Sequence, residues 1–152
     1  MKRLLAPCLL FMFAISAPVS AEELMMTRVM QSFPETMLKL QEVIKHHGYQ
    51  LSRVQRVDIG LANMGYKTDK YRVVFFGKEA QNRWIIDKHP ELIAYLPLKI
   101  AIYAEEDDTM LVSPNLDVLI AAKDPKLKKI VHGWQQDVQK MLKEMQKFGQ
   151  NS

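Results

Sequence analysis

The chain has 152 residues, a formal net charge of +4 at pH 7 and one cysteine, Cys8. This length suits a single domain with an adequate hydrophobic core. One cysteine excludes a disulfide within the chain and covalent haem attachment through Cys-x-x-Cys-His. The weak positive charge gives little support to nucleic-acid binding, so we expect no nucleic-acid partner.

The first 21 residues have the pattern of an export signal. A basic start, Met1-Lys2-Arg3, is followed by an apolar run that ends at Ala17 and by the small-residue sequence Val19-Ser20-Ala21. The apolar run is shorter than the ~20 residues that span a bilayer. We therefore expect cleavage after Ala21, a periplasmic location, and a mature domain of residues 22–152 without a transmembrane segment. Removal of the signal lowers the formal charge to +2 and removes Cys8.

A strand is predicted in residues 22–31, followed by a helix. The candidates for the inner face of this strand are Leu24, Met26 and either Arg28 or Val29. Ser32 and Glu35 form a Ser-x-x-Glu capping box at the start of the helix. Gly48 is placed to adopt the left-handed conformation that ends it.

The next predicted strand, residues 49–59, has an irregular pattern. Arg53 and Gln55 occupy the same parity as apolar residues on either side of them. Either a β-bulge near Arg53 shifts the register, or two polar side chains point inward, where a polar ligand could satisfy them.

The most regular strand pattern lies further along. After a strand at 69–76 and a short helix at 78–88, the segment Leu98–Glu105 alternates apolar and polar residues with a period of two. The acidic run 105–108 is predicted to be a solvated turn that reverses the chain into a strand at 109–113. The last helix begins at Asp124 and Pro125, carries an apolar stripe from Leu127 to Phe148, and is expected to stop at Gly149.

This order predicts an α+β domain with a β-α-β4-α arrangement. One antiparallel sheet would carry both main helices on one face, since each has a single apolar stripe to bury. A long helix over a curved sheet commonly leaves a cleft, and we expect an apolar one here.

Several motifs resemble one known family. They are Ser32-Phe33-x-x-Thr36, Phe75-Phe76-Gly77, Pro90, Tyr95-Leu96-Pro97-Leu98-Lys99-Ile100 and the acidic hairpin. Together they resemble the family called domain of unknown function 302, over nearly all of the mature chain. The resemblance implies a fold similar to TATA-binding-protein-like and helix-grip domains. Lys78-Glu79 stands where that family often has Asn-Pro, and the family carries no catalytic residue that could be transferred.

The histidines and methionines, which could ligate a metal, form no complete metal-binding motif, so no metal site is predicted. His46 and His47 are adjacent on the first helix and point about 100° apart, which argues against their chelating one ion together. Eight methionines remain in the mature chain, but those on helix stripes are typical core fillers. No Gly-x-Ser-x-Gly or other catalytic set is present, so an enzyme is neither supported nor excluded.

The sequence favours a non-catalytic domain that binds a small apolar or amphipathic molecule or a protein partner. The alternative is a periplasmic metal- or haem-binding protein that uses His and Met side chains. No particular cofactor is indicated, and exposed strand edges would allow a homo-oligomer. The candidate ligand-binding residues are Arg53, Tyr71, Phe75, Tyr95, Trp134, Val138 and Met141.

Overall fold

The computed structural model describes residues 23–151, so the predicted export signal lies outside the described residues. The elements in chain order are β1 (Leu24–Val29), α1 (Phe33–His46), β2 (Gln50–Arg56), α2 (Val57–Asn63), β3 (Tyr71–Gly77), α3 (Glu79–Lys88), the 3-10 helix η1 (Pro90–Tyr95), β4 (Leu98–Glu105), β5 (Asp108–Pro114), α4 (Leu116–Leu119) and α5 (Pro125–Gln150). The strands form one antiparallel sheet in the order β1-β5-β4-β3-β2. The α+β prediction is confirmed.

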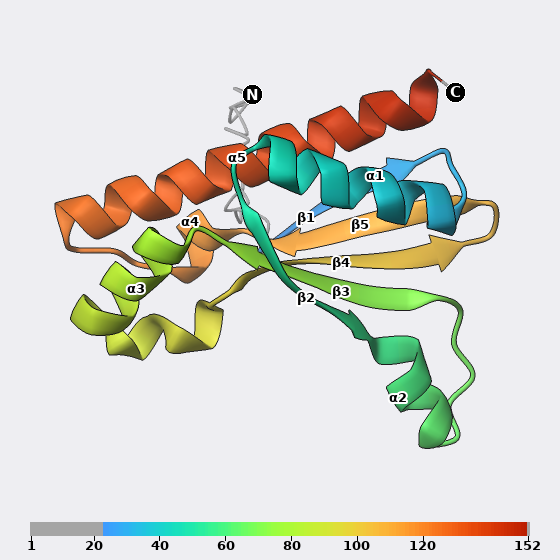
Figure 1. Ribbon diagram of the computed structural model, residues 1–152, viewed down its shortest axis with the longest axis horizontal. Helices are drawn as coiled ribbons and strands as arrows, with labels where there is room; N and C mark the ends of the chain where they lie inside the picture. Colours follow the sequence, from blue (N-terminus) through green and yellow to red (C-terminus); the bar gives the residue numbers. More distant parts are fainter. Residues whose placement is uncertain (1–22, 152) are drawn as a thin grey trace, which may run out of the picture.

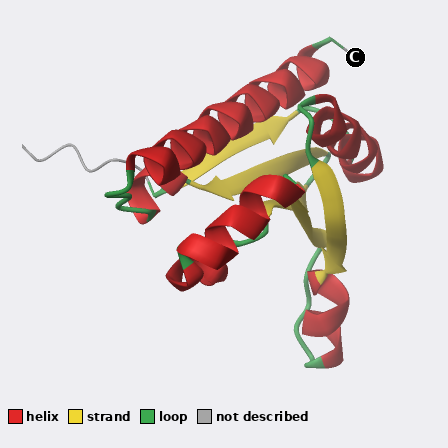
Figure 2. Ribbon diagram, turned by 60° about the vertical axis from the view of Figure 1, so that its left-hand side comes forward, coloured by secondary structure: helices red, strands yellow, loops and turns green. Residues whose placement is uncertain are grey.

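The two long helices, α1 and α5, lie side by side over one face of the sheet (Figures 1 and 2). The helices α2 and α3 lie at opposite ends of the sheet, α2 after β2 and α3 after β3 (Figure 1). No helix within residues 23–151 is long and apolar enough to cross a membrane.

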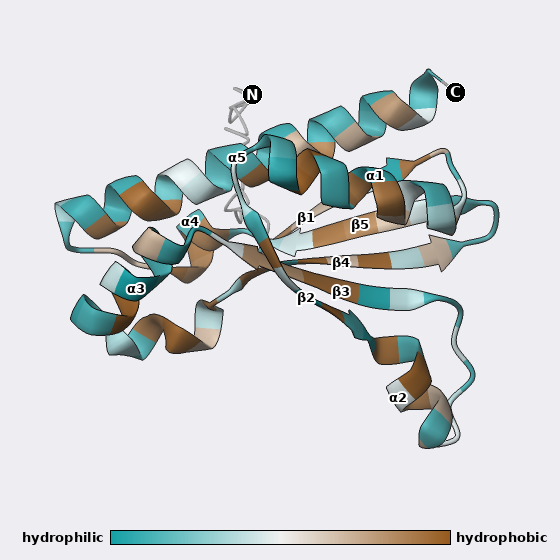
Figure 3. Cartoon of the chain, in the orientation of Figure 1, coloured by the Kyte–Doolittle hydropathy of each residue, from teal (hydrophilic) through white to brown (hydrophobic). Residues whose placement is uncertain are grey.

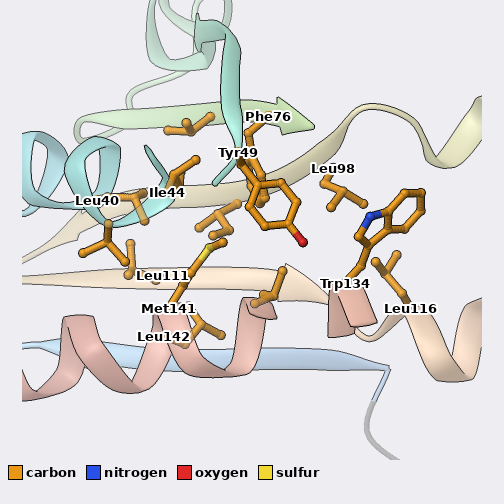
Figure 4. Packing of buried hydrophobic residues seen from close by; sticks show 14 of the residues in the cluster. Leu40, Ile44, Tyr49, Phe76, Leu98, Leu111, Leu116, Trp134, Met141 and Leu142 are labelled. Carbon is orange, nitrogen blue, oxygen red and sulfur yellow. The ribbon is translucent and has the colours of Figure 1, made fainter. Parts of the chain in front are cut away.

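The core fills the space between the helix layer and the sheet. Alternate residues of β4, Leu98, Ile100 and Ile102, are buried and face Trp134 and Met141 of α5. Figure 4 shows Leu98, Trp134 and Met141 among the packed core side chains, and Figure 3 shows brown apolar residues interspersed with teal hydrophilic ones along α1 and α5. The apolar cleft expected between α5 and the sheet is therefore occupied by core side chains.

The parity of β1 differs from the expectation. Val29 is fully buried, whereas Leu24 and Met26 are 50% and 54% exposed. Arg28, on the outward parity, bonds to Glu105 and to Asp108 Oδ2, the latter at 3.1 Å. Burial of Val29 in the core sets which side of β1 faces out, and the outward Arg28 supplies a cation to the acidic turn.

The irregular second strand contains a β-bulge, as one of the two interpretations predicted. The register shifts between Leu51 and Arg53, and both Arg53 and Gln55 are exposed. The strand ends at Arg56, however, and residues 57–63 form α2 instead of continuing it. Asp58 at the start of α2 accepts a bond from Arg72 of β3, a tertiary contact that overrides the strand preference of Val57 and Ile59.

The last helix continues past its expected end. Gly149 lies inside α5 and is buried against the end of β1, where an added Cβ would stand 2.5 Å from Met30 N. The role of this glycine is close packing of helix on strand. It does not stop the helix.

Candidate functional site

The sheet face opposite α1 and α5 retains partly exposed side chains. We call it the open face. Its central apolar and aromatic residues are Met26, Tyr71, Val73, Phe75, Ala101, Tyr103, Met110 and Val112, and the charged residues Arg28, Lys99 and Glu105 also point outward from β1 and β4. The register places them in rows across the strands, with Tyr71 beside Tyr103 and Val73 beside Ala101. Apolar and aromatic side chains therefore occupy the middle of this face, with Lys99 beside Phe75 and Arg28 beside Met110.

A hollow lies on this face near the start of β3. Its volume is about 530 Å³, and it is lined by Thr68, Asp69, Tyr71, Ala101, Tyr103, Ala104 and Val112. The lining combines apolar groups with two phenol side chains and one carboxylate. Such a mixture suits a molecule with an apolar body and a polar end.

Arg53 extends the open face toward the edge strand β2. Its guanidinium carbon lies 5.6 Å from the ring centroid of Phe75, and the two residues are paired in the register of β2 and β3. A stacked guanidinium keeps its donors free for an anionic group while the ring holds its position. Three of the predicted residues, Arg53, Tyr71 and Phe75, thus lie on one surface.

The other predicted residues lie elsewhere. Trp134, Val138 and Met141 are at most 2% exposed and belong to the core on the opposite side of the sheet. The indole nitrogen of Trp134 donates a 2.6 Å hydrogen bond to Gln81 Oε1 of α3. The apolar periodicity of this helix is the same whether its residues line a cleft or fill a core, so the sequence could not separate the two cases. The structure does not bring the seven predicted residues into one cavity.

Tyr95 is separated from both groups. It lies in η1 and lines a hollow of about 400 Å³ between η1 and the segment before α5. His89, Leu119 and Lys123 line the same hollow.

A more polar groove, which the sequence did not indicate, runs beside α3. Its volume is about 850 Å³, and its lining is Gly48, Gln50, Lys78, Glu79, Ala80, Arg83, Trp84 and Asp87. At its edge, Lys78 Nζ lies 4.2 Å from the ring centroid of Tyr49 and 3.3 Å from Asp137 Oδ2. Side chains of both charge signs line this groove, so a larger share of its lining is polar than in the hollow on the open face.

Two adjacent histidines and a glutamate meet where α1 ends. His47 Nε2 lies 3.1 Å from Glu144 Oε2 of α5, and the rings of His46 and His47 are 5.7 Å apart. One potential ligand atom from each of the three lies within 4.8 Å of the other two. The sequence argument against joint chelation assumed helical directions for both histidines, but α1 ends at His46 and His47 is its C-cap. Glu144 is brought to them only by the packing of α5 on α1.

These observations define an α+β domain whose sheet is covered by helices on one face and open on the other. The sequence model of the family described as "Domain of unknown function DUF302" matches residues 25–147, and the chain belongs to this family. The resemblance found in the sequence motifs is therefore confirmed.

A solved structure supports the same fold. The crystal structure of an uncharacterized conserved protein DUF302 from Bacillus stearothermophilus has a TM-score of 0.72 and 20% sequence identity. The alignment covers 81% of this chain and 98% of that one, so the likeness extends over the whole of that protein's fold. A search of curated proteins found no match.

Proposed function

We propose that this domain binds a small amphipathic molecule on its open face without catalysing a reaction. The observation that carries the proposal is the hollow of about 530 Å³ on the open face, with apolar and aromatic lining that includes Tyr71, Tyr103 and Val112. Ligand pockets are commonly about 300–1,000 Å³ and mostly apolar, with a few placed polar groups.

The polar groups around the hollow would orient the ligand. Asp69 lines the hollow together with Tyr71 and Tyr103, so a carboxylate and two phenols are its polar groups. Arg53, stacked on Phe75, offers donors to an anionic head group further along the sheet. This arrangement supports a ligand whose apolar chain lies over the strands and whose polar head group lies near either Asp69 or Arg53.

We propose further that the domain acts after export, in the periplasm. The support is the pattern of residues 1–21, with its basic start, its apolar run and Ala21 at the expected cleavage site. The mature chain has no cysteine, so its folding in an oxidising compartment needs no disulfide.

The alternative of a haem or copper site built on methionine sulfur has less support. Met141 and Met145 have no exposed surface, and Met25 Sδ lies 2.9 Å from Gln135 Nε2. These thioethers are packed with protein groups, which is the usual role of methionine in a core.

The proposal can be tested by an NMR titration with two simple amphiphiles, sodium decanoate and decyltrimethylammonium, below their micelle concentrations. We expect shift changes in the amides of β3, β4 and β5 and a preference for one head-group charge. Tighter binding of decanoate would indicate that Arg53 holds the head group, and tighter binding of decyltrimethylammonium would indicate Asp69. Equal, weak changes over all surfaces would contradict the proposal.

The variants are Tyr103→Ala for the hollow and Tyr66→Ala as the control, because Tyr66 is 63% exposed and lies before β3. Loss of one buried aromatic contact of about 1.5–3 kcal/mol weakens affinity at least about tenfold. We expect this loss in Tyr103→Ala and no change in Tyr66→Ala. Trp134→Ala is unsuitable for this test, because Trp134 is a core residue.

A second copy of the chain is the competing occupant of the open face. Sedimentation equilibrium at micromolar concentration separates the two cases. A monomer that binds decanoate or its cationic counterpart supports the proposal, whereas a dimer that Tyr103→Ala dissociates replaces it with self-association.

A further inference from the structure

The group formed by His46, His47 and Glu144 lies apart from the open face. It belongs to the helix layer, where α1 ends against α5, on the other side of the sheet (Figure 1). Its three donor atoms lie within 4.8 Å of one another. The inference drawn from it is therefore independent of the proposed function.

The end of α1 sets the backbone positions of the two histidines. Gly48 N donates to Lys45 O at 2.9 Å, and Tyr49 N donates to Ile44 O at 3.2 Å. This pair of bonds, with Gly48 at φ +77°, is a Schellman cap, in which the glycine adopts the left-handed conformation. The cap makes His46 the last helical residue and His47 the residue that leaves the helix.

The same cap is fastened to the helix that carries the glutamate. Tyr49 is buried, and its hydroxyl donates a 2.8 Å hydrogen bond to Asp137 Oδ2 of α5. Glu144 lies seven residues further along α5, which places it on the same side of the helix two turns away. The geometry between His47 and Glu144 is therefore set by packed structure on both sides.

The local electrostatics and access suit a cation. The C-terminal end of α1 carries a partial negative charge of about half an elementary charge, and Glu144 adds a carboxylate. The side chain of His47 is 18% exposed and that of Glu144 is 38% exposed, while His46 is exposed. An ion could thus reach the group from solvent without opening the fold.

We propose that His46, His47 and Glu144 bind one divalent transition metal ion, of which zinc is the best match. Two imidazole nitrogens and one carboxylate oxygen are a common zinc ligand set, with bonds of about 2.0–2.2 Å and water at a fourth position. The three donor atoms lie within 4.8 Å of one another, and binding one ion brings them closer together, chiefly through the exposed His46 ring. In the metal-free protein, the His47–Glu144 contact keeps two of the donors together.

The test is a calorimetric titration of the purified, untagged and chelator-treated protein with zinc chloride. We expect one ion per chain and a zinc-dependent rise in melting temperature, because zinc stabilises the folded state that binds it. Cobalt(II) should give the visible absorption of a tetrahedral site. A site with fewer than one ion per chain, or without any thermal shift, would overturn the proposal.

The variants are His47→Ala, Glu144→Gln and His46→Ala, each checked by circular dichroism for an unchanged fold. Loss of a direct ligand should weaken zinc affinity at least about tenfold, since even outer groups contribute about 10–100-fold. The matched control is His132→Ala. His132 Nδ1 also lies 3.0 Å from a carboxylate, that of Asp117, but the pair is not part of a group of three ligands among the described residues. If His132→Ala lowers affinity while the three variants do not, the binding is adventitious and the proposal is wrong.

Discussion

The hydroxyl of Tyr49 donates a 2.8 Å hydrogen bond to Asp137 Oδ2 and so joins the segment that enters β2 to the middle of α5. Tyr49 is 3% exposed, and its ring meets Phe76 edge-on at 5.4 Å between centroids. Burial, and then the hydrogen bond to Asp137, raise the pKa of Tyr49 well above its usual value of about 10. The phenol therefore stays protonated in the folded protein where it would ionise in the unfolded chain.

This contact predicts a loss of stability at alkaline pH. A group whose pKa is raised by folding holds its proton longer in the folded state, so the free energy of unfolding falls as pH rises above about 10. Tyr49→Phe should lower stability by about 1.5–3 kcal/mol at neutral pH, the usual contribution of a hydrogen bond to a charged group. It should also flatten the alkaline decline.

Urea denaturation at pH 8 and at pH 10.5 measures both effects. Tyr66→Phe is the control, because Tyr66 is 63% exposed. Equal alkaline declines in Tyr49→Phe and in the unmodified protein would show that Tyr49 is not the responsible group.

Two glycines in α5 should respond to alanine with opposite signs. An added Cβ at Gly149 would stand 2.5 Å from Met30 N, a backbone atom that cannot move alone, whereas at Gly133 it would meet no atom within 4 Å. We expect Gly149→Ala to destabilise the protein by about 1–3 kcal/mol, as overpacking does. Gly133→Ala should stabilise it by about 0.5–1 kcal/mol through helix propensity. Chemical denaturation of both variants checks this, and the same sign for both would contradict the packing assigned to Gly149.

The Asp58–Arg72 pair should control the order of α2. This helix buries none of its residues, and Figures 1 and 2 show it extending away from the rest of the domain. The hydrogen bond from Arg72 lowers the pKa of Asp58, so the contact stabilises α2 at neutral pH and is lost as acid protonates the carboxylate. Asp58→Asn should speed amide hydrogen exchange in residues 57–63 but not in β4. The control is Asp69→Asn, at an exposed acidic residue between α2 and β3, which should leave amide hydrogen exchange in α2 unchanged.

The export pattern predicts a defined mature N-terminus. Expression of the whole chain in a Gram-negative host should give a periplasmic protein whose intact mass begins at Glu22. Ala21→Arg should block this cleavage, because signal peptidase sites need a small residue there. Recovery of the full 152-residue chain from the cytoplasm would contradict the periplasmic proposal.

The sequence was most informative where one local rule acted alone. The strict alternation in Leu98–Glu105 predicted β4 with its observed bounds, and Gly48 was placed correctly because ending a helix in the left-handed region favours glycine. The bulge near Arg53 was one of the two alternatives that the broken alternation of the second strand left open. Among the proposed site residues, Arg53, Tyr71 and Phe75 share a surface because they share outward positions on neighbouring strands.

Periodicity and the start and stop signals of helices therefore predicted the fold class, the main strands and the two long helices of this protein, because each pattern depends on residues close together in the chain. The tertiary structure decided which apolar stripe became core and which apolar strand face stayed open, because burial depends on what packs against a surface. It also decided the end of β2 through Asp58 and Arg72, and it brought Glu144 to His47 across 97 residues of sequence. Contacts over such separations are set by helix-on-helix packing, and no local pattern encodes them.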